Sequence, residues 1–258
     1  MTPDRPQRRN LSERDVHLDY RLTGTVEVDE DAQLRILSAD EQARADRFVF
    51  PQHRTTFIAA HWLLRTTLSR YADVAPREWV FVRNPYGKPL LGDEQRRLAA
   101  LDFNLAHTEG LIACVVRRGG AVGVDVESMR HRGRSVEIAR RFFSPQEIRE
   151  LDACPAHLID ARFVELWTLK EAYVKAVGTG LSRPLDTFSF AFTGRSGLRF
   201  ESALGDAATW DFALLAPTPD HRIAVAVGRG ADGPARITIW ARESAIEDAA
   251  ILRTSLTG

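Results

Sequence analysis

The chain has 258 residues, of which 44% are hydrophobic and 27% charged, a composition typical of a folded protein with a sizeable core. Its 35 basic and 35 acidic side chains cancel, which argues against a general nucleic-acid binder, because such proteins usually carry a basic excess. No apolar window approaches the length of a membrane span, and the first ten residues lack the apolar core of a secretory signal. We therefore expect a cytoplasmic protein that binds neither nucleic acid nor membrane.

A duplication runs through the chain from about residue 35. Ser38-Ala-Asp-Glu41 is matched by Ser144-Pro-Gln-Glu147, and each pattern predicts a capping box at the start of a helix. A longer helix follows in each half, over about residues 54–71 and 161–177. Chance similarity is the alternative, but four matched elements in one order favour duplication. The matched strand-like segments are Trp79–Val82 with Phe188–Phe192, Leu101–Leu105 with Trp210–Leu215, and Leu111–Val116 with Arg222–Val227.

We therefore expect an α+β fold in which two similar subdomains pack about a pseudo-two-fold axis within one chain. The expected parts are a disordered segment over residues 1–14, an N-terminal subdomain over 15–118 and a C-terminal subdomain over 119–258. The interface between two such halves is a favoured place for a ligand cleft. Because the duplication already supplies the second half, we also expect a monomer.

The segment Ala121-Val-Gly-Val-Asp-Val-Glu127 predicts a strand with its valines on one face and Gly123, Asp125 and Glu127 on the other. Two carboxylates on one face of an apolar strand repel each other and are costly to desolvate. A divalent cation would relieve both costs, and Mg²⁺ prefers oxygen ligands of this kind. Two solvated carboxylates at the end of a surface strand would explain the pattern equally well.

A helix is predicted to end near Gly178 and Gly180, since glycines commonly follow the last turn. Glu171 and Lys175 lie one turn apart on this helix, on a face that differs from the core-facing stripe of Leu166, Leu169, Tyr173 and Val177. Taken alone, this pair is best interpreted as an ordinary exposed ion pair of little energetic value.

Three further features could serve a phosphate ligand. The strand Asp102–Thr108 delivers His107 to its end, the turn Asn84–Pro89 presents Lys88, and several arginines lie in the first helical region. A histidine or an arginine fork can donate hydrogen bonds to phosphate oxygens. A structural histidine, a solvated lysine and solvated arginines are the commoner explanations when each feature is taken by itself.

Taken together, the motifs stand in an informative order: NPYGKP at 84–89, FNLAHT at 103–108, GVDVE at 123–127, RRFFSPQE at 140–147 and WTLKEAYVKAVGTGLS at 167–182. This series resembles the Sfp-type branch of the 4′-phosphopantetheinyl transferases over roughly residues 35–228. The resemblance implies a single-chain pseudo-dimer of two α+β halves, which agrees with the duplication. It also implies an enzyme that transfers the 4′-phosphopantetheine group of coenzyme A to a serine of an apo acyl or peptidyl carrier protein, with release of 3′,5′-ADP.

The resemblance also implies roles for individual residues. The acidic residues Asp125, Glu127 and Glu171 would hold Mg²⁺ against the pyrophosphate of coenzyme A. Glu171, Lys175 and Asp125 would form the catalytic set, with Glu171 as the general base, directly or through a water molecule. The expected contacts to coenzyme A are Lys175, Arg44, Arg54, Lys88, His107 and Thr108.

The chain departs from the family at Ala106, where a serine is usual. Thr108 or a backbone N–H would have to replace the missing hydroxyl, and we expect weaker affinity for coenzyme A rather than loss of activity. The Ser128–Arg134 loop and the Phe142–Glu147 segment are expected to face the carrier protein, with a solvated flexible loop as the alternative for the first.

Two other functions fit parts of the pattern. A Mg²⁺-dependent hydrolase of a nucleotide pyrophosphate could use the same acidic residues. A non-catalytic module that binds carrier proteins could descend from the transferase, although the intact acidic residues and Lys175 argue against such decay.

Overall fold

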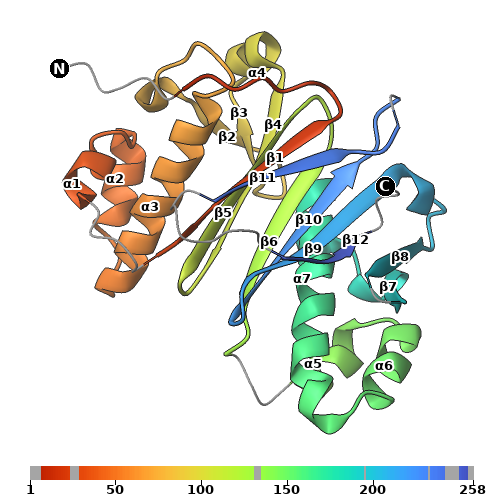
Figure 1. The fold of residues 1–258 in the computed structure, drawn as a ribbon. Helices are drawn as coiled ribbons and strands as arrows, with labels where there is room; N and C mark the ends of the chain where they lie inside the picture. The colour runs from red at the N-terminus through yellow and green to blue at the C-terminus, as the bar shows by residue number, and fades with distance from the viewer. Residues whose placement is uncertain are drawn as a thin grey trace.

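The structure, a computed structural model, describes residues 7–23, 29–130, 135–194, 196–231, 233–241 and 250–254 (Figure 1). The first half contains β1 (Asp15–Leu22), α1 (Glu30–Leu34), α2 (Ala39–Ala45), α3 (Pro51–Leu68), β2 (Phe81–Arg83), β3 (Pro89–Leu91), α4 (Asp93–Ala99), β4 (Leu101–Thr108) and β5 (Leu111–Arg118). The second half contains β6 (Val122–Ser128), α5 (Ser135–Phe142), α6 (Pro145–Asp152), α7 (Ile159–Val177), β7 (Phe188–Thr193), β8 (Gly197–Ser202), β9 (Trp210–Thr218), β10 (His221–Gly228), β11 (Arg236–Ala241) and β12 (Ala250–Thr254).

Two large sheets pack face to face between two long helices. One sheet has the strand order β11-β1-β5-β4 and the other β6-β10-β9-β12-β8-β7, while β2 and β3 form a separate hairpin. Alternate residues of β1 and β5 meet the valines of β6 and β10 in an apolar layer between the sheets. The outer faces are covered by α3 on the first sheet and α7 on the second, as Figure 1 shows.

The predicted α+β fold of two similar halves is confirmed. The antiparallel order β1-β5-β4 recurs as β6-β10-β9, and in each half the long helix covers the outer face of its sheet. Both predicted capping boxes are present, with Ser38 and Glu41 at the start of α2 and Ser144 and Glu147 at the start of α6. Among the described residues, every helix is too short or too polar to cross a lipid bilayer.

The N-terminal segment contacts the first half of the chain. Residues 1–6 lie outside the described part, and most side chains over 7–14 are exposed, so the disorder expected over 1–14 stays a prediction. Leu11 is 2% exposed within the core under α3, and Arg9 makes an ion pair with the fully buried Asp19. The buried Leu11 and the ion pair of Arg9 therefore attach this polar segment, which is rich in arginine and proline, to the first half.

A strand from the second half of the chain joins the sheet of the first half, across the boundary expected at residue 118. The strand β11 pairs in parallel with β1 of the first sheet, and β12 then returns to pair with β9 and β8 of the second.

A local difference from the sequence-based expectation is Trp79, which was expected in a strand. It instead precedes β2, with its indole buried and its Nε1 donating to Ser69 Oγ.

A close contact between a helix and a sheet lies at Gly123 on β6. A Cβ atom at this position would stand 2.1 Å from the carbonyl oxygen of Ala172 and 2.4 Å from the amide nitrogen of Ala176, both on α7. Only glycine therefore allows the main chain of α7 to rest on β6. The same contact brings side chains of α7 next to those that follow Gly123 along the same face of the strand.

We predict that Gly123→Ala lowers the free energy of unfolding by about 3 kcal/mol, because α7 must move away from β6 to admit the methyl group. Urea denaturation followed by circular dichroism measures this change. Gly230→Ala is the matched control, since its nearest neighbouring atom would be 4.0 Å away. Equal stability of the two variants would contradict the close approach.

Candidate active site

An ion pair between Asp125 on β6 and Lys175 on α7 lies at the centre of the site. Lys175 Nζ is 2.5 Å from Asp125 Oδ1, and the side chain of Asp125 is 7% exposed. The other oxygen, Asp125 Oδ2, is buried without a hydrogen-bond partner among the described residues. Burial raises the pKa of Asp125, and the positive charge of Lys175 opposes that rise.

Two more carboxylates share this electrostatic environment. Burial and then the charge of Asp125 raise the pKa of Glu127 to about 7, while Lys175 and a hydrogen bond from Trp167 oppose the shift. Burial and Asp125 also raise the pKa of Glu171, again against Lys175. The three acidic residues predicted from the sequence therefore interact through their charges.

A pocket of about 300 Å³ opens beside this cluster, where the two halves meet. Glu171 and Lys175 contribute to its wall from α7, and the turn between β2 and β3 faces them. Its other lining residues are Asn104, Leu105, Val174, Gly178 and Gly180. The expected cleft at the interface of the halves is therefore present, with predicted catalytic residues in its wall.

His107 lies near the end of β4 in a positively charged environment. Its ring is exposed, yet the surrounding protein and the charges of Lys175, Arg44 and His53 lower its pKa. Arg44 is exposed on α2, with its guanidinium 5.2 Å from the ring centre of Phe57. The structure thus groups His107, Arg44 and Lys175 around a region suited to an anion.

Two residues that were expected to contact phosphate form other interactions in the structure. Arg54 makes ion pairs with Glu30 and with Asp46, the latter at 3.4 Å, so the structure does not bring it to the other site residues. Lys88 is at the pocket, but its ammonium turns inward and donates to the main-chain oxygens of Val122 and Ala176. Burial lowers the pKa of Lys88 to about 8.

The end of β4 has an apolar side as well. Ala106 is buried in the layer between the sheets, and Thr108 follows on the same face of the strand, half-buried.

Sequence reasoning missed Asn104, whose Oδ1 accepts a hydrogen bond of 2.9 Å from the amide of Val124 and so joins β4 to β6. A polar residue at the centre of an apolar strand was the available signal.

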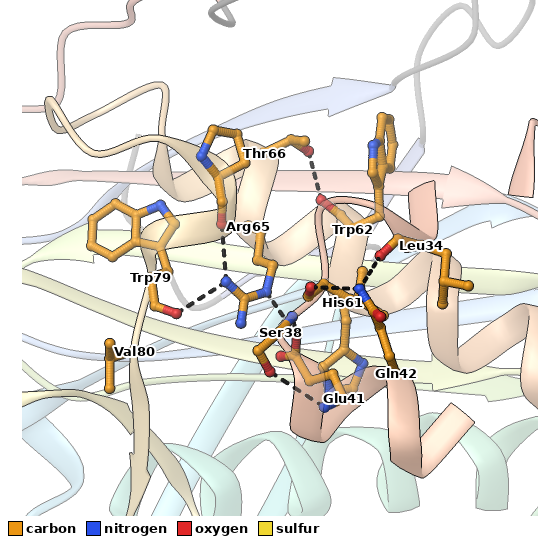
Figure 2. Close-up of polar contacts among 12 residues, drawn as sticks. Leu34, Ser38, Glu41, Gln42, His61, Trp62, Arg65, Thr66, Trp79 and Val80 are labelled. Carbon is orange, nitrogen blue, oxygen red and sulfur yellow. Dashed lines mark hydrogen bonds and ion pairs between the residues drawn. The ribbon is translucent and has the colours of Figure 1, made fainter. Parts of the chain in front are cut away.

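A buried ion pair supports the long helix in each half. Figure 2 shows Glu41 of α2 accepting from Arg65 of α3, whose guanidinium also donates to the carbonyl oxygens of Pro76 and Trp79. In the second half, Glu147 of α6 pairs with Lys170 of α7 at 2.7 Å, with both side chains fully buried. Arg65 is one of the arginines of the first helical region, for which solvation was the commoner explanation, but it is 1% exposed.

The expected surface for a partner protein is only partly described. Residues 131–134 of the Ser128–Arg134 loop lie outside the described residues. In the Phe142–Glu147 segment, Phe142 is 39% exposed, whereas Glu147 is buried and engaged with Lys170. Only part of that segment can therefore meet a partner.

The described residues contain no group of three or more histidine, cysteine, aspartate or glutamate side chains arranged to hold a metal ion. In the arrangement seen, Asp125 Oδ1 is engaged by Lys175 rather than turned towards the other two carboxylates. The donors themselves still suit a hard divalent cation, because the buried Asp125 Oδ2 has no hydrogen-bond partner among the described residues and the charge of Asp125 raises the pKa of both glutamates.

Comparisons with known proteins match both halves of the chain to one family. A family model described as the 4′-phosphopantetheinyl transferase superfamily matches residues 121–226, and one described as 4′-phosphopantetheinyl transferase, N-terminal, matches residues 27–117. The 4′-phosphopantetheinyl transferase HetI of Nostoc sp. is 37% identical over 191 residues, which cover 74% of this chain and 78% of the relative. A 4′-phosphopantetheinyl transferase of Bacillus subtilis is 32% identical, over 67% of this chain and 73% of the relative. The Sfp enzyme of the same species is 30% identical, over 60% and 66%.

We predict that Lys170→Met lowers the free energy of unfolding by about 3–5 kcal/mol, because it leaves Glu147 charged and buried without its partner. Thermal and urea denaturation measure the loss. Arg199→Met is the control, since its ion pair with Glu201 is largely exposed and should contribute little. A Lys170→Met protein as stable as the control would show that the buried pair is unimportant.

The raised pKa of Glu127 predicts a pH-dependent stability of the metal-free protein. Between its ordinary pKa of 4.5 and about 7, the folded protein binds more protons than the unfolded chain, so its stability falls as pH rises. Glu127→Gln should therefore be about 1–3 kcal/mol more stable than the unsubstituted protein at about pH 8, and the gap should close towards about pH 4.5.

Urea denaturation in the presence of a chelator at both pH values tests this expectation. Glu201→Gln, at an exposed position on β8, should show no such dependence. A Glu127→Gln protein that is less stable at the higher pH would reverse the expected sign.

Proposed function

The chain belongs to the 4′-phosphopantetheinyl transferase superfamily, and we propose that it transfers the 4′-phosphopantetheine group of coenzyme A to a serine of an apo acyl or peptidyl carrier protein. The observation that carries this proposal is the cluster of Asp125, Glu127, Glu171 and Lys175 beside a pocket at the interface of the halves. Such a cluster suits a phosphoryl-type transfer, in which positioning and charge neutralisation supply most of the catalysis.

In the proposed reaction, the serine hydroxyl oxygen of the carrier attacks the β-phosphorus of coenzyme A. The bond from this phosphorus to the oxygen that bridges the two phosphates breaks, and 3′,5′-ADP leaves with the electron pair. The hydroxyl proton passes to Glu171, directly or through water. Its raised pKa makes Glu171 a stronger base than an ordinary glutamate, which helps a general base near neutral pH.

Cationic side chains would stabilise the negative charge of the pyrophosphate. Lys175 contributes to the pocket wall and is 32% exposed, so its ammonium can meet a phosphate oxygen as well as Asp125. His107 and Arg44 supply further donors from the first half. A Mg²⁺ ion held by Asp125, Glu127 and Glu171 would supply additional charge neutralisation on the phosphate oxygens.

Each half of the single chain contributes to the pocket, which favours a monomer in solution. Asn104 and Leu105 come from the first half, and Glu171 and Lys175 from the second. Light scattering on the purified protein checks this state.

Intact mass of an apo carrier protein, incubated with this protein, coenzyme A and Mg²⁺, is the direct test of the function. We expect a mass gain of one phosphopantetheine, lost when EDTA is added. Release of 3′,5′-ADP without any gain in carrier mass would instead indicate a pyrophosphate hydrolase. No reaction with several carriers, despite bound coenzyme A, would indicate a binding module.

Site variants refine this test. Glu171→Gln and Lys175→Ala should each lower kcat/KM by about 10²–10³-fold while the fold persists, since each group acts on the reacting atoms. Arg83→Ala is the control, because Arg83 is exposed on β2 and donates only within its own turn, to Gly87. Unchanged kcat/KM in the first two variants would overturn their assignment.

A further inference from the structure

The turn between β2 and β3 is attached to the second half of the chain by two side chains. Asn84 Nδ2 donates to the carbonyl oxygen of Gly178 at 2.8 Å. Lys88 Nζ donates to the carbonyl oxygen of Ala176 at 3.0 Å and to that of Val122 at 3.1 Å. All three acceptors lie on the elements that carry the acidic residues, because Val122 begins β6 while Ala176 and Gly178 end α7.

The acceptors are carbonyl groups that need partners. The last four carbonyls of a helix lack acceptor bonds within it, and a lysine near a helix C-terminus also interacts favourably with the helix dipole. Ala176 lies in this last turn of α7. Lys88 thus supplies a donor to a carbonyl in the last turn of α7, and both of its hydrogen bonds within the described chain go to main-chain oxygens.

The turn itself is held in one conformation before it meets α7. Asn84 Oδ1 accepts from the amides of Tyr86 and Lys88, at 3.0 and 2.9 Å, and Gly87 adopts a positive φ of 88°. On the other side, Gly178 ends α7 with φ of 78°, and a Cβ there would stand 3.1 Å from Lys88 Cδ. The absence of a side chain at Gly178 lets the turn approach the end of the helix.

This attachment joins two parts of the lining of the candidate coenzyme A pocket. Tyr86, Gly87, Lys88 and Pro89 form one wall, and Glu171, Val174 and Lys175 of α7 contribute to the rest of the lining. The two groups come from different halves of the chain. Asn84 and Lys88 link them by side-chain hydrogen bonds.

We propose that Lys88 and Asn84 are positioning residues, which set the coenzyme A pocket by fastening the β2–β3 turn to α7 and β6, rather than by contacting a phosphate. The proposal rests on the proposed function for the identity of the ligand. It replaces the sequence-based expectation that the Lys88 ammonium contacts the nucleotide phosphates.

The test compares Lys88→Met, Asn84→Ala and the control Arg83→Met. Arg83 is an exposed cation at the end of β2, and its side-chain hydrogen bond among the described residues goes to Gly87. Asn84 carries no charge, so an effect of its removal cannot come from a lost phosphate contact. We expect KM for coenzyme A to rise about 10-fold in Lys88→Met and in Asn84→Ala. We expect kcat to stay within about two-fold of the value for the unsubstituted protein, since Gly123 and Lys175 still hold the catalytic groups. The control should leave both constants unchanged.

Two measurements without a carrier protein separate the explanations. Hydrogen exchange of the ligand-free protein should become faster at residues 86–88 and 178 in both variants. The loss of coenzyme A affinity, measured by calorimetry, should be the same fold at about 0.05 and about 0.5 M salt, because no charge contact is removed. Failure of the unsubstituted protein to modify any carrier would count against the proposed function. Hydrogen exchange and coenzyme A affinity would still test the role of Lys88 and Asn84, because neither measurement uses a carrier.

Three results would overturn the proposal. One is unchanged exchange together with an affinity loss that shrinks at high salt and occurs only in Lys88→Met, which would indicate a direct phosphate contact. Another is faster exchange with unchanged KM, which would indicate a purely structural link. The third is a coenzyme A affinity that is the same in both variants as in the unsubstituted protein.

Discussion

The main chain of α7 rests directly on β6, and the site depends on this contact. Gly123 makes it possible, because any side chain there would overlap the carbonyl of Ala172. Once the helix lies this close, Lys175 reaches Asp125 two residues further along the strand, and Glu171 shares the same face. A cluster of like charges that would be costly on an open surface strand is thereby gathered around one lysine at the edge of a pocket.

The two halves stabilise their long helices in the same way. Each uses a capping-box glutamate as acceptor for a buried cation on its long helix, Glu41 for Arg65 and Glu147 for Lys170. Removing one partner of such a pair leaves a buried charge, so both pairs constrain the helices to one position. The lysine that precedes Glu171 in the sequence motif is thus structural, while Lys175, five residues later, faces the pocket. One motif therefore serves both stability and chemistry.

Several polar side chains near the pocket join the halves, and one of them, Lys88, was expected from the sequence to contact the ligand. Asn104 links β4 to β6, and the β2–β3 turn reaches α7 through Asn84 and Lys88. The strand β11 adds a third connection by pairing with β1. Because the pocket exists only where the halves meet, residues that fix their relative position affect it without touching a ligand. Polar side chains near the pocket are therefore divided between ligand binding and assembly.

Local patterns in the sequence determined the capping boxes, the alternation of Val124 with Asp125 and the end of α7 at Gly178, because each depends on residues a few positions apart. The order of motifs was enough to indicate the family. Tertiary structure alone decided that Arg54 pairs with Glu30, that Lys88 turns towards main-chain oxygens, and that Leu11 is buried in the core of the first half. The physical reason is that a side chain's partner is set by which distant elements surround it, and spacing along the chain carries no record of that.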